Sequence, residues 1–196
     1  QNLIGTQRQQ QLVTNWLSKR YRVADEAIDM LVSATYLTAK ETKLDPLLIL
    51  SVIAIESRFN PFSESPVGAQ GLMQVMSKVH HEKFSDLGGI KAALNPVANI
   101  KVGAMILKEY VNSAGSVEAG LKRYVGAADM ETDGGYGGLV MAEYKRLKDV
   151  AAGKSVSIYS TTAKPSMISR PQEVNDKRPD EITQQASMNT DQIAGI

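Results

Sequence analysis

The sequence contains no cysteine among its 196 residues. A disulfide framework, a cysteine nucleophile and a thiolate metal site are therefore all excluded. An excess of charge of one sign is also lacking, because 22 lysines and arginines stand against 21 aspartates and glutamates, for a formal net charge of +1. This balance gives no electrostatic reason to expect binding to nucleic acid or to a membrane surface.

Long hydrophobic runs are missing as well. The longest apolar stretch, residues 47–55, is far shorter than the roughly 20 residues that span a bilayer, and it fits a buried helix instead. No secretory signal is visible, and the chain begins at Gln1 rather than at methionine. We therefore expect a processed or trimmed chain whose signal or membrane anchor would lie upstream.

What the sequence does contain is a series of helical patterns. Apolar residues recur at three- and four-residue steps over residues 24–39, which predicts an amphipathic helix. The helix opened by Asp45-Pro46 is apolar on nearly all sides, so it is expected at the centre of the core. Further helices are predicted over residues 72–84, 96–111, 117–124 and 139–150. No strand pattern is sustained, which favours an all-α domain.

The chain divides into three parts by composition. Residues 1–23 form a polar N-terminal extension, in which Trp16 and Leu17 belong to a short amphipathic helix that packs on the domain or docks on a partner. Residues 24–152 carry the helical patterns and form the folded domain. Residues 153–196 are rich in Ser, Thr, Gln and Pro, so we expect a disordered tail that is a candidate binding segment for another protein.

Glu56 is unusual because it follows apolar residues on one helix face. Its neighbours three, four and seven positions back are Ile53, Val52 and Ile49. A carboxylate in such surroundings is costly to ionise, so it is expected to keep its proton and to suit general acid catalysis. In the alternative interpretation, Glu56 turns to solvent or pairs with Arg58 at the helix end.

Short polar side chains and glycines follow Glu56 in a loop predicted over residues 58–71. The polar members are Ser57, Asn60, Ser63 and Ser65. Gly68 and Gly71 allow close approach of the backbone to a ligand, and Gln74 comes shortly after. A carboxylate facing hydroxyls and amides is typical of a sugar-binding cleft, although these residues are also what any loop contains.

Two sequence elements stand at a characteristic spacing. They are Glu56-Ser57-Arg58-Phe59-Asn60-Pro61 and Ser65-Pro66-Val67-Gly68-Ala69-Gln70-Gly71-Leu72-Met73-Gln74. With Asp45-Pro46 before them and Asn95-Pro96 after them, they resemble the signature of soluble lytic transglycosylases, the SLT-domain family. The resemblance covers about residues 24–150 and implies an all-α, lysozyme-like helical domain built around a central apolar helix.

The resemblance also implies a reaction on bacterial peptidoglycan. Family members cleave the β-1,4 bond between N-acetylmuramic acid and N-acetylglucosamine without water, and leave a 1,6-anhydro end. One carboxyl group is enough, because it first protonates the leaving oxygen and then accepts the proton of the 6-hydroxyl. This differs from the two-carboxylate scheme of most glycosidases.

Residue roles follow by position in the motifs. Glu56 matches the catalytic acid and base, and Ser65 matches a serine that contacts the substrate. Met73 and Gln74 match cleft residues that hold sugar rings, and Tyr124 matches a tyrosine close to the catalytic glutamate. Two further residues are expected to support the site. These are Ser57, which braces the helix end, and Gly71.

The sequence departs from the family pattern in three places. The usual Ala-Tyr-Asn is replaced by Arg123-Tyr124-Val125, so an amide is missing and a cation is added. Met76-Ser77-Lys78 stands where proline and threonine usually follow the second element. A glycine-rich loop over residues 126–138 carries Asp129, Glu131 and Asp133.

Two alternatives remain open. A goose-lysozyme-like hydrolase would use one of the carboxylates at positions 129, 131 and 133 to position water. A non-catalytic glycan-binding module would instead recruit a cell-wall or secretion assembly through the tail. We expect no cofactor and no metal, because adjacent His80 and His81 point to different helix faces. We expect a monomer that acts on peptidoglycan in the bacterial periplasm, since the substrate lies there.

Overall fold

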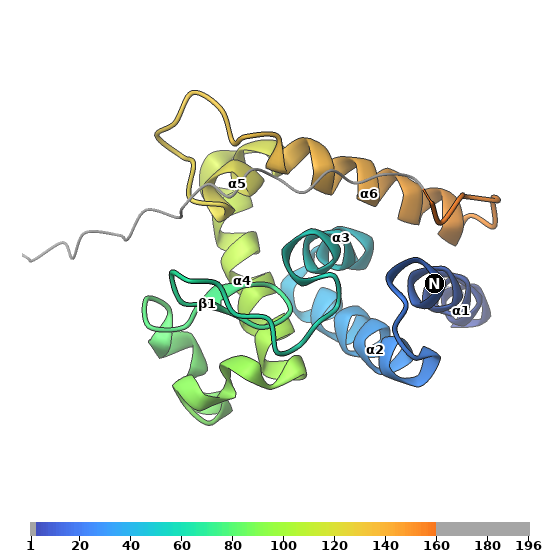
Figure 1. The fold of residues 1–196 in the computed structure, drawn as a ribbon, viewed down its shortest axis with the longest axis horizontal. Coiled ribbons are helices and arrows are strands. Elements are labelled where there is room, and N and C mark those ends of the chain that lie inside the picture. Colours follow the sequence, from blue (N-terminus) through green and yellow to red (C-terminus); the bar gives the residue numbers. More distant parts are fainter. Residues whose placement is uncertain (1–2, 160–196) are drawn as a thin grey trace, which may run out of the picture.

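The computed structural model describes residues 3–159, with side chains from residue 6 onward. This part of the chain is mostly helical, with a small antiparallel sheet and short 3-10 helices (Figure 1). The elements are α1 (Leu3–Tyr21), α2 (Asp25–Thr42), α3 (Pro46–Ser57), β1 (Ala69–Gln70), β2 (Val75–Met76), η1 (His81–Leu87), η2 (Ile90–Leu94), α4 (Pro96–Ala114), α5 (Val117–Tyr124) and α6 (Tyr136–Ala151). The prediction of an all-α domain is confirmed. Over residues 3–159, no helix has the length and apolar character needed to cross a bilayer.

Helix α3 lies in the middle of the domain, as its continuous apolar run predicts. Its fully buried side chains include Ile49, Leu50, Val52 and Ile53. The Oδ1 atom of Asp45 accepts a hydrogen bond from the Leu47 amide at 2.8 Å, and Pro46 occupies the first helical position. The predicted N-cap is therefore present, and it fixes where the central helix begins.

The helices after α1 fall into two groups, one on α3 and one on α4. Helices α2 and α6 pack directly on α3, and Figure 1 shows α3 between them. Helix α4 packs on α2 and α5, and η1 and η2 lie beside α4. This arrangement leaves the C-terminal end of α3 close to α6, where the candidate catalytic residue is found.

The predicted N-terminal amphipathic helix is present as α1 and packs on the domain. Val13 and Leu17 are fully buried, and Trp16 is almost fully buried. The neighbours of α1 are α2 and α6. Its apolar side chains therefore belong to the same hydrophobic core as those of α3.

A buried ionic network joins α1 to α6. The carboxylate of Glu143, which has no exposed surface, accepts hydrogen bonds from Arg20 Nε at 2.9 Å and from Tyr21 Oη at 2.6 Å. Arg146 Nη1 donates a further bond to it at 2.8 Å. A buried charge is tolerated only when it is paired and hydrogen-bonded, and these three side chains provide both.

The segment after α6 returns along α1. Trp16 Nε1 donates to the carbonyl oxygen of Val156 at 3.0 Å, and Arg20 Nη1 donates to that of Ile158 at 2.9 Å. The region predicted as a tail from residue 153 thus begins with residues that pack on the domain. The remainder of the predicted disordered tail, residues 160–196, lies outside the described residues.

The prediction of a helix over residues 72–84 is wrong. A hairpin forms instead, with Ala69 paired to Met76 in register, and η1 follows it. The reason lies in Asn99 of α4, which is fully buried. Its Oδ1 accepts from the Met73 amide at 2.8 Å, and its Nδ2 donates to the carbonyls of Gln70 at 2.8 Å and Ala93 at 2.7 Å. These tertiary bonds hold the backbone of Gln70 and Met73 against α4, and no local sequence pattern indicates them.

Candidate active site

Glu56 lies in the last turn of α3 and is half-buried. The side chains of Ile49, Val52 and Ile53, which share its helix face, have no exposed surface. The helix ends at Ser57, whose Oγ donates to the Ile53 carbonyl at 3.1 Å. Arg58 then adopts a left-handed conformation with φ of 52°. The carboxylate is thus carried by a rigid, deeply anchored element.

Tyr136 holds the carboxylate of Glu56 from a distant part of the chain. Its hydroxyl donates to Glu56 Oε1 at 2.9 Å, and its ring is almost fully buried at the start of α6. Sequence reasoning missed this residue, because 80 positions separate it from Glu56 and no local pattern marks it. A buried tyrosine is expected to find such a partner for its hydroxyl.

The loop after Glu56 is held by hydrogen bonds of its own. Ser65 Oγ accepts from the Ala69 amide at 3.0 Å, so this hydroxyl helps to close a turn. The Gln74 side-chain amide donates to the carbonyls of Ser63 and Gly71, each at 3.0 Å. Gln74 itself has a φ of 49°. The two ends of the loop are therefore fixed to each other.

Gly71 is required by close packing in this loop. Its φ is 75°, and a Cβ atom at this position would overlap the Asn99 side-chain amide and lie 2.8 Å from the Ala93 carbonyl. A larger residue would push the hairpin away from α4. The close contact of this loop with Asn99 and Ala93 therefore depends on the missing side chain of Gly71.

Met73 and Tyr124 are joined inside the domain. The Tyr124 hydroxyl donates to the Met73 carbonyl at 2.7 Å. The Met73 side chain is fully buried and packs against Gly103, where any Cβ would overlap it. The structure thus places Met73 in the core, and its side chain offers no surface to a sugar ring.

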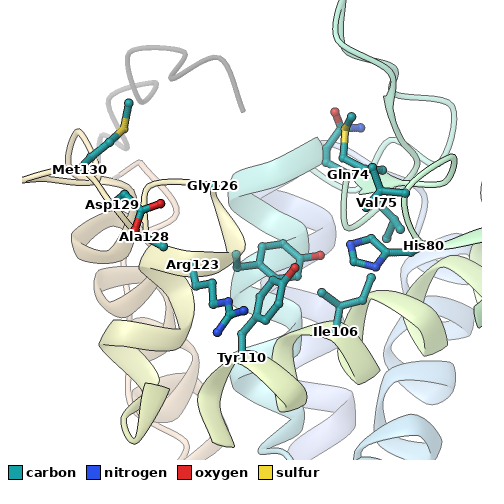
Figure 2. Close-up of a pocket in the computed structure, with 13 residues that line it drawn as sticks. Gln74, Val75, His80, Ile106, Tyr110, Arg123, Gly126, Ala128, Asp129 and Met130 are labelled. Carbon is teal, nitrogen blue, oxygen red and sulfur yellow. The ribbon is translucent and has the colours of Figure 1, made fainter. Parts of the chain in front are cut away.

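A cavity of about 510 Å³ lies beside these residues. Its lining comes from the segment around β2, from α4 and α5, and from the loop after α5 (Figure 2). The lining residues are Gln74, Val75, Met76, Val79, His80, Ile106, Tyr110, Arg123, Tyr124, Gly126, Ala128, Asp129 and Met130. Pockets of this volume are typical of small-ligand sites.

The cavity brings together only some of the residues predicted for the site. Gln74 and Tyr124 line it, whereas Glu56, Ser65 and Met73 are not among its lining residues. Helix α3 runs behind the cavity in the view of Figure 2. Glu56 is therefore not part of the cavity wall.

Sequence reasoning missed other lining residues, notably Met76, His80 and Tyr110. The Tyr110 and Tyr124 rings meet edge to face, with centroids 6.4 Å apart. Met76 lies in the part that was predicted to be helical, and its position became clear only with the hairpin. The sequence placed Tyr110 on the helix predicted over residues 96–111, and a position on a helix does not by itself show that a residue lines a cavity.

The three loop carboxylates lie in different settings. Asp133 accepts hydrogen bonds from the backbone amides of Gly135 at 2.9 Å and Gly137 at 2.7 Å, so it holds the start of α6. Glu131 is exposed. Asp129 lines the cavity. Of these three, Asp129 is the one placed to meet a ligand there.

The adjacent residues His80 and His81 do not share one site. No group of three or more His, Cys, Asp and Glu side chains in residues 3–159 could hold a metal ion. His80 lines the cavity, while His81 is exposed and its Nδ1 lies 3.2 Å from the Lys78 carbonyl oxygen. The two histidines are therefore in separate environments.

Comparison with known proteins finds a family model that matches the central part of the chain. The model of the transglycosylase SLT domain matches residues 35–129. This part of the chain is therefore similar to a transglycosylase SLT domain. The motif residues from Glu56 to Gln74 lie within the matched part, and so does Tyr124. Tyr136 lies beyond it, although its hydroxyl contacts Glu56.

One relative has a similar sequence over part of the chain. It is a protein of Enterobacteria phage PRD1 with the name transglycosylase, and it is 37% identical over 86 residues. The aligned part covers 44% of this chain and 31% of the phage protein. The chain therefore spans about a third of the length of this relative.

Proposed function

We propose that the chain is a peptidoglycan lytic transglycosylase and that Glu56 is its acid and base. The observation that carries the proposal is the setting of Glu56 within the part that matches the SLT domain. Glu56 lies in the last turn of a buried apolar helix, and its carboxylate accepts a hydrogen bond from Tyr136. A carboxyl group in partly apolar surroundings, oriented by a second residue, suits proton transfer in a catalytic site.

The proposed reaction needs one carboxyl group. Protonated Glu56 donates its proton to the oxygen between N-acetylmuramic acid and N-acetylglucosamine, and the β-1,4 bond to C1 of the muramic residue breaks. The Glu56 carboxylate then accepts the proton of the muramic 6-hydroxyl, while the oxygen of this hydroxyl bonds to C1. The product is a 1,6-anhydro end, no water is consumed, and Glu56 is protonated again.

Two groups of residues are proposed to assist. Gln74 and Tyr124 line the cavity and would contact sugar rings, and Ser65 would contact the substrate from the loop. Ser57, Gly71 and Met73 would position the site, through the helix end, the tight turn and the Met73 carbonyl that Tyr124 holds. We therefore assign Met73 a positioning role in place of a sugar contact.

Digestion of purified peptidoglycan followed by mass analysis of the products tests the reaction. The unmodified protein is expected to release anhydromuramic ends. Glu56→Gln should lower the rate by about 1,000-fold, because general acid and base catalysis contributes on the order of 10²–10⁴. Glu131→Gln, in the exposed part of the loop, is the matched control and should retain full activity.

The outcomes separate the proposal from a non-catalytic role. If Glu56→Gln clears cell-wall suspensions as fast as the unmodified protein, catalysis through Glu56 is wrong. If the unmodified protein and the Glu56→Gln variant both bind glycan strands but neither releases products, the domain is a binding module.

A hydrolase is the second candidate, because Asp129 lines the cavity. A hydrolase would use this carboxylate to position water and would leave reducing muramic acid ends. Asp129→Asn is expected to retain production of anhydro ends. Reducing ends from the unmodified protein, lost in Asp129→Asn, would establish the hydrolase instead.

The proposed substrate also sets the place of action. Peptidoglycan lies outside the cytoplasm, so we propose that the protein is exported and acts in the bacterial periplasm. Glycan strands are its proposed binding partners, and the monomer is the proposed active form.

A further inference from the structure

The cavity contains a positive charge that the proposed reaction does not use. Arg123 of α5 is exposed and lines the cavity beside Tyr110 (Figure 2). Among the described residues, Arg123 forms no ion pair, whereas Arg20, Lys83 and Lys101 each have a carboxylate partner. A guanidinium without a carboxylate partner at a ligand cavity is available to bind an anion.

Neighbouring side chains hold this guanidinium in place. Its Cζ atom lies 4.9 Å from the centre of the Tyr110 ring, and Nη1 donates to Ser113 Oγ at 3.2 Å. The stacking and the single hydrogen bond leave several N–H donors of the planar group uncommitted. Because the group is held before a ligand arrives, little further ordering is needed for binding.

The charge of the cavity is mixed, so recognition by Arg123 would be local. Asp129 lines the same cavity and carries the opposite charge, but it does not pair with Arg123. A ligand with a carboxylate at one position is therefore favoured over one with negative charge throughout. A planar guanidinium is suited to such a carboxylate because it can donate two parallel hydrogen bonds.

We propose that Arg123 is a specificity-determining residue that binds a carboxylate of the peptidoglycan strand. This proposal rests on the proposed function, since it assumes that the cavity receives the glycan. Carboxylates occur in two places on such a strand. They belong to the stem peptides, or to the lactyl groups of muramic residues that have lost their peptides. Arg123 would favour strands that carry either carboxylate over neutral sugar chains.

The test measures the Kd of uncross-linked strands for proteins in a Glu56→Gln background, so that the strands are not cleaved. Arg123→Gln is expected to raise the Kd by about tenfold on strands with free carboxylates. Arg123→Lys keeps the charge and should restore part of the affinity. Lys122→Gln is the matched control on the adjacent residue, which does not line the cavity, and it should leave the Kd unchanged.

Chemical blocking identifies the source of the carboxylate. Strands with intact stem peptides are compared before and after amidation of the stem carboxylates, and peptide-free strands before and after amidation of the lactyl carboxylates. The effect of Arg123→Gln on the Kd should vanish when one of these two kinds of carboxylate is amidated. That kind is then the carboxylate that Arg123 binds. An effect of the same size on all blocked strands would indicate a structural role for Arg123 and would overturn the proposal, as would an unchanged Kd.

The failure of the proposed function would be seen separately. Release of anhydro ends by the protein with Glu56 intact is measured on the same strands. If no ends are released while the Kd still depends on Arg123 and on a carboxylate, the transglycosylase proposal fails and carboxylate recognition stands.

Discussion

At the level of single residues, the hydrogen bond from Tyr136 to Glu56 joins α6, which lies beyond the part that matches the SLT domain, to the end of α3 within that part. Tyr136→Phe removes the hydroxyl and keeps the buried ring. We expect kcat to fall by about tenfold with little change in KM, because the carboxylate loses its fixed orientation while the sugar contacts remain. Steady-state kinetics on soluble glycan strands measures both constants.

Tyr144→Phe is the control for this change. The Tyr144 hydroxyl donates to Asp45 Oδ2 at 2.6 Å at the other end of α3, so the same atom is lost far from Glu56. Its kcat should stay within about twofold of the unmodified protein. Equal losses of kcat in the two variants would show that α6 acts only as a structural support.

Gly71 offers a second prediction at the same scale. Gly71→Ala is expected to lower the free energy of unfolding by about 2–4 kcal/mol, since the added methyl group meets Asn99 and the Ala93 carbonyl. Gly68→Ala is the matched control. Gly68 also has a positive φ, 89°, but nothing lies within 4 Å of its Cβ position, so only about 1 kcal/mol should be lost. Urea denaturation compares the two, and similar losses would contradict the packing argument.

At the level of elements, α6 holds both ends of α3. Tyr136 contacts Glu56 near the C-terminal end, and Tyr144 contacts the capping residue Asp45 at the N-terminal end. The two helices therefore run side by side in opposite directions. Position and angle of the central helix depend on this pairing as well as on its buried apolar side chains.

Stability at alkaline pH reports on the tyrosines near the N-terminal end of α3. Burial and the hydrogen bond to Asp45 raise the pKa of Tyr144 to about 12, and burial and the Asp45 charge raise that of Tyr36 to about 12. Unfolded tyrosine titrates near about 10. Above that pH the native state holds protons that the unfolded state has lost, so the free energy of unfolding should fall between about pH 10 and 12.

Urea denaturation at several pH values from neutral to alkaline measures this decline. The double variant Tyr36→Phe/Tyr144→Phe should show a shallower decline than the unmodified protein. Tyr159→Phe, at a largely exposed residue, should leave the decline unchanged. A decline of the same steepness in the double variant would mean that other groups cause it, such as Tyr21, whose pKa burial and Glu143 also raise.

Local patterns in the sequence predict most of the helices and few of the contacts between them. The predicted helix over residues 117–124 matches α5, and the Asp45-Pro46 signal marks the start of α3, because capping and periodicity are local properties. The hairpin around Met73 was not predicted, since its hydrogen bonds come from Asn99. Its two-residue strands are also too short to show any alternation.

Some residues of the candidate site follow from local sequence motifs, and others are found only from the packing of the helices. Glu56, Gln74 and Tyr124 follow from motif positions, but their predicted roles stay predictions. Tyr136 could not be found from its surroundings in the sequence, because only the packing of α6 on α3 brings it to Glu56. The predicted contact of Met73 with sugar ignored the core position that its contact with Gly103 imposes.

At the level of the whole molecule, the ionic network of Glu143 fastens α1 to α6. Glu143→Gln leaves Arg20 and Arg146 without their carboxylate partner. We expect the free energy of unfolding to fall by about 3–5 kcal/mol, because breaking a buried pair leaves uncompensated charge. Asp149→Asn, which removes the surface pairs with Lys145 and Lys154, is the control on α6.

Chemical denaturation again supplies the measurement. The control should change the free energy of unfolding only slightly, as is usual for surface ion pairs. A loss of the same small size in Glu143→Gln would show that the network adds nothing beyond ordinary surface pairing.

The contacts of the segment after α6 have a consequence for synthesis on the ribosome. Trp16 and Arg20 bond to carbonyls of Val156 and Ile158, so the first helix needs partners that are translated about 140 residues later. While the chain emerges, the buried face of α1 has only α2 to cover it, and the apolar surface meant for α6 stays open. The domain can reach its final packing only after its last described residues have left the exit tunnel, and until then this apolar surface of the nascent chain is open to other contacts.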